Sequence, residues 1–335
     1  MMNVEIGLAN QFKAIIIDKD GNERFNSGWH KNMILDSFLK EWKAKGSNYK
    51  TELYNNKYKG VNNVLSYLHI GEGNSTPVKT QTQLDRFVAS ASSVSSTWWA
   101  NNFKKHPSKP IIYNWCECKF TFTDTIKGKN LTEIGLCASN TASPEHPIVT
   151  RALIRDANGQ PTTIALREGE QLVIIYKVYA VLPSTEKNTT MEFNYWEGGV
   201  KKSTKQLSTR SGFLLTGHRY SLWTGITYDP YWLWQDETFT VTNNVKSGGN
   251  DFNPDGEYSH YEETANGCRL ILGLSNTSQN IEKVGGFYFR ADTMTWYCIF
   301  RDSANKPLDK DATTRMDITI DFTIAPWNGN VAELT

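Results

Sequence analysis

Hydrophobic and polar residues alternate one by one along several stretches of the chain, and a period of two is typical of β-strands buried on one face. The clearest stretch is 316–324, where methionine, isoleucine and phenylalanine alternate with aspartate and threonine. Between Cys116 and Phe122, two cysteines and two phenylalanines share one face. The stretch 172–182 is apolar on both faces, which predicts a central strand.

Tight-turn signals separate these stretches at short intervals. Asp-Gly and Asn-Gly pairs supply the positive φ that tight hairpins require. The chain therefore reads as mainly β, with antiparallel β-sandwich or jelly-roll-like domains and one or two short helices near the N-terminus. Asp20-Gly21 and Asn158-Gly159 follow strand-like stretches, and Glu168-Gly169 precedes the stretch that starts at Leu172.

Helical spacing of apolar residues predicts one helix over 32–45, with Asn32 as its cap and Gly46 as its stop. A second, shorter helix is predicted over 83–89, where Leu84, Phe87 and Val88 would share a side.

A polar stretch at 183–190 is the best internal boundary, because it follows the double-faced strand. It divides the chain into an N-terminal β-sandwich domain, 1–182, and a C-terminal β domain, 191–335, with 183–190 as the linker.

The composition excludes several classes of protein. The chain has 335 residues and a net charge of +1, whereas a nucleic-acid binder is expected to show a basic stripe. No apolar stretch is long enough to span a membrane, and the N-terminus does not resemble a secretory signal. The five cysteines are thinly spread and odd in number. We therefore expect a soluble protein with reduced, buried thiols.

Four blocks of the N-terminal half, taken in order, resemble bacteriophage tail and baseplate proteins over roughly residues 10–180. The resemblance implies a first domain that serves virion assembly and has no catalytic residues to carry over. The blocks are Trp29-His-Lys-Asn32-Met-Ile-Leu35; Leu65-Ser-Tyr-Leu-His-Ile70-Gly71-Glu-Gly73-Asn-Ser-Thr-Pro77, followed by Leu84; Asn130-Leu-Thr-Glu133-Ile-Gly135-Leu; and the hairpin and strand from Ile148 to Tyr176.

By this resemblance the chain is a non-enzymatic structural component of a phage virion, most simply a baseplate, ring or fibre-attachment protein of the tail. Its expected partners are copies of itself and other tail proteins, and it would be assembled in the bacterial host cytoplasm. Two alternatives stay open, a carbohydrate- or receptor-binding tail tip that contacts a host surface glycan, and a capsid decoration or head-fibre protein.

Catalytic motifs give no competing function. The six histidines are scattered, and neither a nucleophile elbow nor a phosphate-binding loop is present in the sequence. A polysaccharide-cleaving enzyme stays open only because a pair of carboxylates could serve such a reaction.

One loop, 251–262, matches the spacing of a calcium-binding loop, with a glycine at its sixth position. Its flanks are loop-forming residues and not the two helices of an EF-hand, so a solvated polar turn is the alternative. A bound Ca²⁺ would be structural. The candidate ligands are Asp251, Asn253, Asp255, Glu257 and Glu262.

Aromatic residues cluster around a turn at Asp229-Pro230. Rigid aromatic surfaces suit a subunit interface or a sugar ring, and the alternative is that they close one end of a sandwich. The candidates for an interface or glycan platform are Trp223, Tyr228, Tyr231, Trp232 and Trp234.

Overall fold

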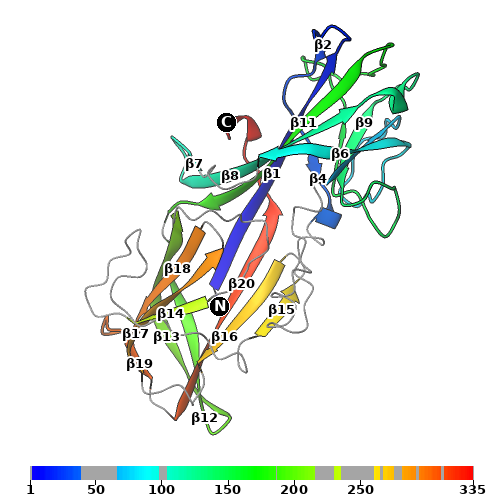
Figure 1. Ribbon diagram of the computed structural model, residues 1–335. Helices are drawn as coiled ribbons and strands as arrows, with labels where there is room; N and C mark the ends of the chain where they lie inside the picture. The colour runs from blue at the N-terminus through cyan, green and yellow to red at the C-terminus, as the bar shows by residue number, and fades with distance from the viewer. Residues whose placement is uncertain are drawn as a thin grey trace.

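The computed structural model describes residues 2–38, 66–97, 104–185, 187–215, 230–234, 260–264, 267–274, 281–291, 294–310 and 313–334. Strands make up 59% of the structure and helices 4%, which confirms the mainly β fold. Figure 1 shows an upper and a lower lobe, joined along β1 (Met2–Ile17) and β20 (Thr314–Pro326).

The upper lobe contains the strands from β2 to β11, the short 3₁₀ helix η1 (Asp124–Ile126) and a helical turn at 36–38. The strands are β2 (Glu23–Asn26), β3 (His30–Lys31), β4 (Met33–Ile34), β5 (Tyr67–Gly71), β6 (Phe87–Thr97), β7 (Lys104–Lys105), β8 (Ile111–Phe122), β9 (Glu133–Cys137), β10 (Thr150–Leu153) and β11 (Gln171–Pro183).

The lower lobe contains the strands from β12 to β20, and the 3₁₀ helix η2 (Val331–Glu333) follows them. The strands before β20 are β12 (Lys187–Glu197), β13 (Val200–Leu215), β14 (Pro230–Trp234), β15 (His260–Thr264), β16 (Gly267–Leu274), β17 (Ile281–Ala291), β18 (Met294–Arg301) and β19 (Leu308–Lys310).

The long strand β1 belongs to both lobes. Residues 2–8 pair in parallel with 320–326 of β20, and residues 7–17 pair antiparallel with β11. The other strand pairings in the described residues are antiparallel. After β20 the chain returns to the upper lobe, where Val331 and Leu334 pack with Tyr113 and Tyr179. The two lobes are therefore tied together by both ends of the chain.

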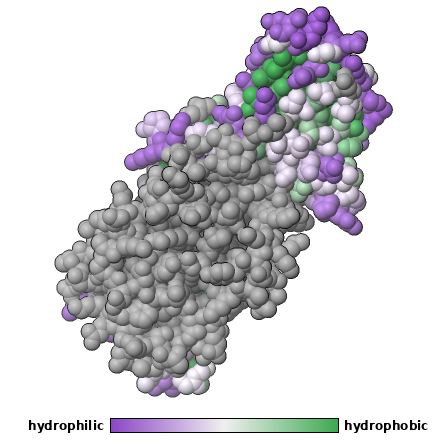
Figure 2. Space-filling model, viewed as in Figure 1, coloured by the Kyte–Doolittle hydropathy of each residue, from purple (hydrophilic) through white to green (hydrophobic). Residues whose placement is uncertain are grey.

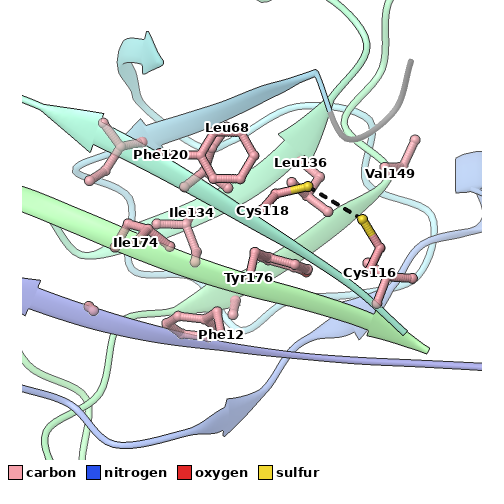
Figure 3. Close-up of a cluster of buried hydrophobic side chains, with 14 of the residues drawn as sticks. Phe12, Leu68, Cys116, Cys118, Phe120, Ile134, Leu136, Val149, Ile174 and Tyr176 are labelled. Atoms are coloured by element: carbon pink, nitrogen blue, oxygen red, sulfur yellow. Dashed lines mark hydrogen bonds between the residues drawn. The ribbon is translucent and has the colours of Figure 1, made fainter. Parts of the chain in front are cut away.

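The core of the upper lobe confirms that alternate residues of the predicted strand at 116–122 share a buried face. Cys116, Cys118 and Phe120 of β8 all face this core, where Tyr176 of β11 and Phe12 of β1 meet them (Figure 3). β11 pairs with β1 on one edge and with β8 on the other, as expected of a central strand. Its second face is half-buried at Ile175 and Lys177 and buried at Tyr179 and Val181, where the C-terminal residues of the chain cover it.

Both predicted helices need correction within the described residues. Asn32 does not cap a helix, because β4 intervenes and the helical turn starts at residue 36; the predicted residues 39–45 lie outside the described part of the chain. The segment 83–89 is not helical, since bends lead into β6 at Phe87. Backbone pairing of β6 with β5 and β8 outweighs the helical spacing of three apolar side chains.

The predicted linker, 183–190, is mostly strand in the structure. β11 ends at Pro183, and β12 begins at Lys187 and pairs with β13 from that residue onward. A division of the chain at this point would also separate β1 from β20, which are paired. The two-domain organisation stays a prediction.

Candidate functional site

A buried arginine is the centre of a polar network that joins β9, β10 and the β5–β6 loop. Arg151 of β10 donates from Nε to Glu133 (2.9 Å) and from Nη2 to Asp85 (2.7 Å). Nη1 donates to Gln81 (2.7 Å) and Ser75 (3.1 Å), and Nη2 also lies 2.8 Å from the Glu133 carboxylate. A guanidinium has five N–H donors, and four of them donate hydrogen bonds in this network.

Both carboxylate oxygens of Glu133, in β9, also accept several hydrogen bonds. Its Oε1 accepts from the backbone N–H groups of Gly73 and Arg86 (both 2.9 Å), and its Oε2 accepts from that of Asp85 (3.2 Å). Both Arg151 and Glu133 are 0% exposed. A buried charge is tolerated where it is paired and fully hydrogen-bonded, and both charges meet that condition.

The glycines of the Gly71-x-Gly73 motif are required by this carboxylate. A Cβ at Gly73 would lie 2.3 Å from Glu133 Oε1, and one at Gly71 would lie 2.7 Å from the same atom. Gly135 is constrained similarly, since a Cβ there would lie 2.6 Å from the Thr150 carbonyl oxygen. The motif is therefore a cradle for a carboxylate and its backbone donors.

Asp85 closes the network on its more open side. Burial alone would raise the pKa of Asp85, but hydrogen bonds from Ser75 and the positive charge of Arg151 hold the pKa below its usual value. The loop between β5 and β6 is thus anchored at Gly73, Ser75, Gln81 and Asp85. The buried charges of Glu133 and Arg151 therefore hold the backbone of this loop in place.

A cavity of about 470 Å³ lies beside the network, where the β5–β6 loop, β1, β4, β10 and the segment after β20 meet. Its walls include Leu8, Ala9, Met33, Ile34, Pro77, Ala152, Leu153, Pro326 and Trp327. Its polar and charged lining residues are Asn10, Lys31, Asn32, Thr76, Lys79, Arg151, Arg155 and Asn328.

Asn32, which was predicted to cap a helix, instead lies in the wall of this cavity. Its Nδ2 donates to the hydroxyl of Tyr176 (2.6 Å), which in turn donates to Thr150 Oγ1 (3.0 Å), and its backbone N–H donates to Asn10 Oδ1 (3.2 Å). Burial raises the pKa of Tyr176, so its hydroxyl stays neutral. These bonds hold the two asparagines in place.

A second cavity, of about 640 Å³, lies on the lower lobe across β12, β13 and β18. Thr190, Ser208 and Arg301 lie directly opposite one another across the three strands, and Arg210 lines the cavity as well. Burial lowers the pKa of Arg301, and the like charge of Arg210 lowers it further. This surface is rich in hydroxyl and guanidinium donors.

The site residues predicted from the sequence lie largely outside the described residues. Of the candidate calcium ligands, Asp251, Asn253, Asp255 and Glu257 are outside, and only the backbone of Glu262 is described, in β15. In the described part of the chain no group of three or more His, Cys, Asp or Glu residues could hold a metal ion. The calcium site stays a prediction.

The predicted aromatic cluster also lies largely outside the described residues. Trp223 and Tyr228 are outside the described residues, and Tyr231, Trp232 and Trp234 are placed only by the backbone of β14, which pairs with β17. Whether these residues form an interface or a glycan platform stays a prediction.

The arginine network was not predicted from the sequence, although Gly71, Gly73 and Glu133 belong to blocks that carry the resemblance. The signal that could have found it is Arg151 itself, a charged residue inside the strongly apolar run 148–154. Such a residue is almost never fully buried without a partner of opposite charge.

No helix in the described ranges is long and apolar enough to cross a membrane. The chain matches no protein-family model, no curated protein and no solved structure.

Proposed function

We propose that the chain is a non-enzymatic structural component of a bacteriophage virion, a tail protein that assembles with copies of itself and with other tail proteins. The observation that carries the proposal is the meeting of the blocks on which the resemblance rests. Gly71 and Gly73 cradle Glu133, which pairs with Arg151, and Arg151 lies opposite Met33 across β10 and β4. Residues from these blocks are therefore in contact with one another in the folded chain.

The chemistry of this unit supports a structural role. Arg151 and Glu133 are fully buried and use their hydrogen-bonding groups on each other and on the β5–β6 loop. Groups saturated in this way are not free to bind or activate a substrate, whereas they hold a loop in a fixed shape. A fixed surface loop is what a repeated contact between subunits requires.

Surface features of the upper lobe support an interface. Figure 2 shows hydrophobic residues at the surface of this lobe among hydrophilic ones. Trp29, Val78 and Phe87 are large hydrophobic residues that are exposed there, and Val78 belongs to the anchored β5–β6 loop. Exposed apolar groups on a fixed frame favour burial against another protein.

The proposal is tested on the purified chain by native mass spectrometry and light scattering, and by co-purification with dissociated tails of the source phage. A closed oligomer of defined subunit number, or a stoichiometric complex with a tail protein, is expected. A chain that stays monomeric at high concentration and binds no tail protein contradicts the proposal.

A second candidate, a carbohydrate-binding tail tip, is favoured by the cavity on the lower lobe. Asn188, Thr190, Ser208, Arg210 and Arg301 line it, and amide, hydroxyl and guanidinium groups are the donors and acceptors that sugars use. A glycan array with Arg301→Met and Trp232→Ala as separate variants distinguishes this cavity from the aromatic cluster. An array with no bound glycan excludes this candidate.

A further inference from the structure

We infer that the cavity formed by the β5–β6 loop, β1, β4, β10 and the segment after β20 binds a short peptide segment that carries acidic and apolar side chains. The inference deepens the proposed function and rests on it for the source of the peptide, another virion protein. The binding itself follows from the cavity's frame, its charge and two buried amides.

The frame of the cavity is already formed in the chain alone. The backbone N–H of Trp327 donates to the Leu8 carbonyl (2.6 Å), which fixes the segment after β20 against β1. The backbone N–H of Asp36 donates to the Lys79 carbonyl (2.9 Å), which fixes the β5–β6 loop on the opposite side. A preformed cavity of this size is in the range that accepts a ligand or a few side chains, and it costs little ordering on binding.

The charge of the cavity is positive. Lys31, Lys79 and Arg155 line it, and none of its lining residues among those described is Asp or Glu. Arg151 also lines it, but Glu133 and Asp85 neutralise that charge. The positive charge available to a ligand therefore comes from the two lysines and Arg155.

These three cations are not neutralised by ion pairs within the described residues. Arg155 donates from Nη1 to the Gly159 carbonyl (2.6 Å), which orients the guanidinium without neutralising it. Lys31 and Lys79 are exposed at the cavity and form no ion pair with any described residue. Such a group favours acidic side chains, with an attraction that weakens as salt is added.

Two buried amides favour a peptide over a simple anion. Asn10 is 1% exposed and Asn32 is 3% exposed, and both line the cavity. Among the described residues, Asn10 Nδ2 and Asn32 Oδ1 have no hydrogen-bond partner. A donor and an acceptor left unpaired in a buried wall are costly, and one residue of an extended peptide can offer both, because its N–H and C=O point to the same side.

The apolar walls of the cavity suit a peptide that also carries an apolar side chain. Leu8, Met33, Leu153, Pro77 and Trp327 give the cavity hydrophobic sides between the amides and the cations. A peptide with an apolar side chain next to an acidic one would bury the first against these walls and place the second toward the cations.

The experiment uses the full chain and a bead-bound library of random octapeptides. Peptides are selected on the wild-type chain and then measured by fluorescence anisotropy against variants. Lys31→Glu combined with Lys79→Glu reverses the charge, and Leu153→Trp fills the cavity. Lys129→Glu combined with Lys201→Glu is the matched control, because both lysines are exposed and neither lines the cavity.

The selected peptides are expected to be enriched in Asp or Glu next to an apolar residue. Their affinity should fall at least tenfold in the charge-reversed and the cavity-filled chains, stay within twofold in the control, and fall with added salt. N-methylation of one backbone amide in the peptide should weaken binding, as expected if that N–H meets Asn32. Melting temperatures check that each variant is folded.

A library that yields no binding peptide, peptides without acidic residues, or affinities equal in all variants would overturn the inference. Because the test needs no virion protein, its failure leaves the proposed function standing. Conversely, a monomeric chain that binds acidic peptides in the cavity would overturn the assembly role and retain the site.

Discussion

Replacement of Arg151 by methionine is the perturbation that most directly examines the buried network. Methionine keeps an unbranched apolar side chain on β10 but removes the guanidinium. The Glu133 charge then stays buried with backbone N–H groups alone, and Ser75 and Gln81 lose their donor. Removal of one partner of a buried ion pair costs about 3–5 kcal/mol of unfolding free energy.

The expected loss is measured by denaturant unfolding of the wild type, Arg151→Met, Glu133→Gln and the double variant. A loss of this size lowers the melting temperature by about 6–20 °C, at roughly 2–4 °C per kcal/mol for a unit of about 150–250 residues. The two changes should be less than additive by about 0.5–3 kcal/mol, since they act on one interaction. Trypsin cleavage at Lys79 should become faster, because the loop loses its anchors.

Arg155→Met is the matched control. Arg155 lies just after β10 and is partly exposed, and within the described ranges its side chain donates a single hydrogen bond, to the Gly159 carbonyl. Its removal should cost less than about 1 kcal/mol. If Arg151→Met is no more damaging than this control, and cleavage at Lys79 is unchanged, the network does not hold the loop and the reasoning is refuted.

Three further predictions concern single features of the fold. Gly73→Ala should destabilise the chain by more than about 1 kcal/mol in urea unfolding, because its Cβ would lie 2.3 Å from the Asp85 Cβ; an unchanged midpoint contradicts the cradle. The hydrogen bond from the Arg24 side chain holds the pKa of Glu170 below its usual value. Glu170→Gln should therefore be less stable than wild type at pH 7, with a difference that shrinks as the pH falls below the ordinary carboxylate range near 4, whereas a constant difference would exclude linkage. Burial raises the pKa of Cys116, so peptide mapping should find Cys116 and Cys118 unalkylated by iodoacetamide at pH 8 in the native chain and alkylated in urea; native labelling of either contradicts their burial.

The strands and their buried faces were predictable from the sequence because alternation is a local property. The cysteines and phenylalanines of β8 face one core, as their spacing required. The two-sided burial of β11 was also correctly anticipated. Gly21 and Gly159 have φ of +87° and +81°, as their turn signals indicated.

The helices and the site were not predictable in the same way, because their determinants are distant in sequence. Asn32 bonds to Asn10 and Tyr176, which are 22 and 144 residues away, and these bonds outweigh a local capping role. Arg151 reaches Glu133 over 18 residues and Ser75 over 76. Spacing along the chain carries no information about such pairs.

The cavity beside the arginine network was not predictable for the same reason. Its walls come from β1, from the β5–β6 loop and from Trp327 after β20, so no single segment carries its pattern. Only the parallel pairing of β1 with β20 brings the two ends of the chain to this point.

The proposed structural role in a phage tail is tested most directly by electron microscopy of phage particles that are purified from cells producing this chain and labelled with a gold-conjugated antibody against it. Label at one fixed position on the tail, at a constant copy number per particle, is the expected result. Particles without label, from cells in which the chain is abundant and unassembled, would contradict the claim; label on the head would favour a decoration or head-fibre protein instead.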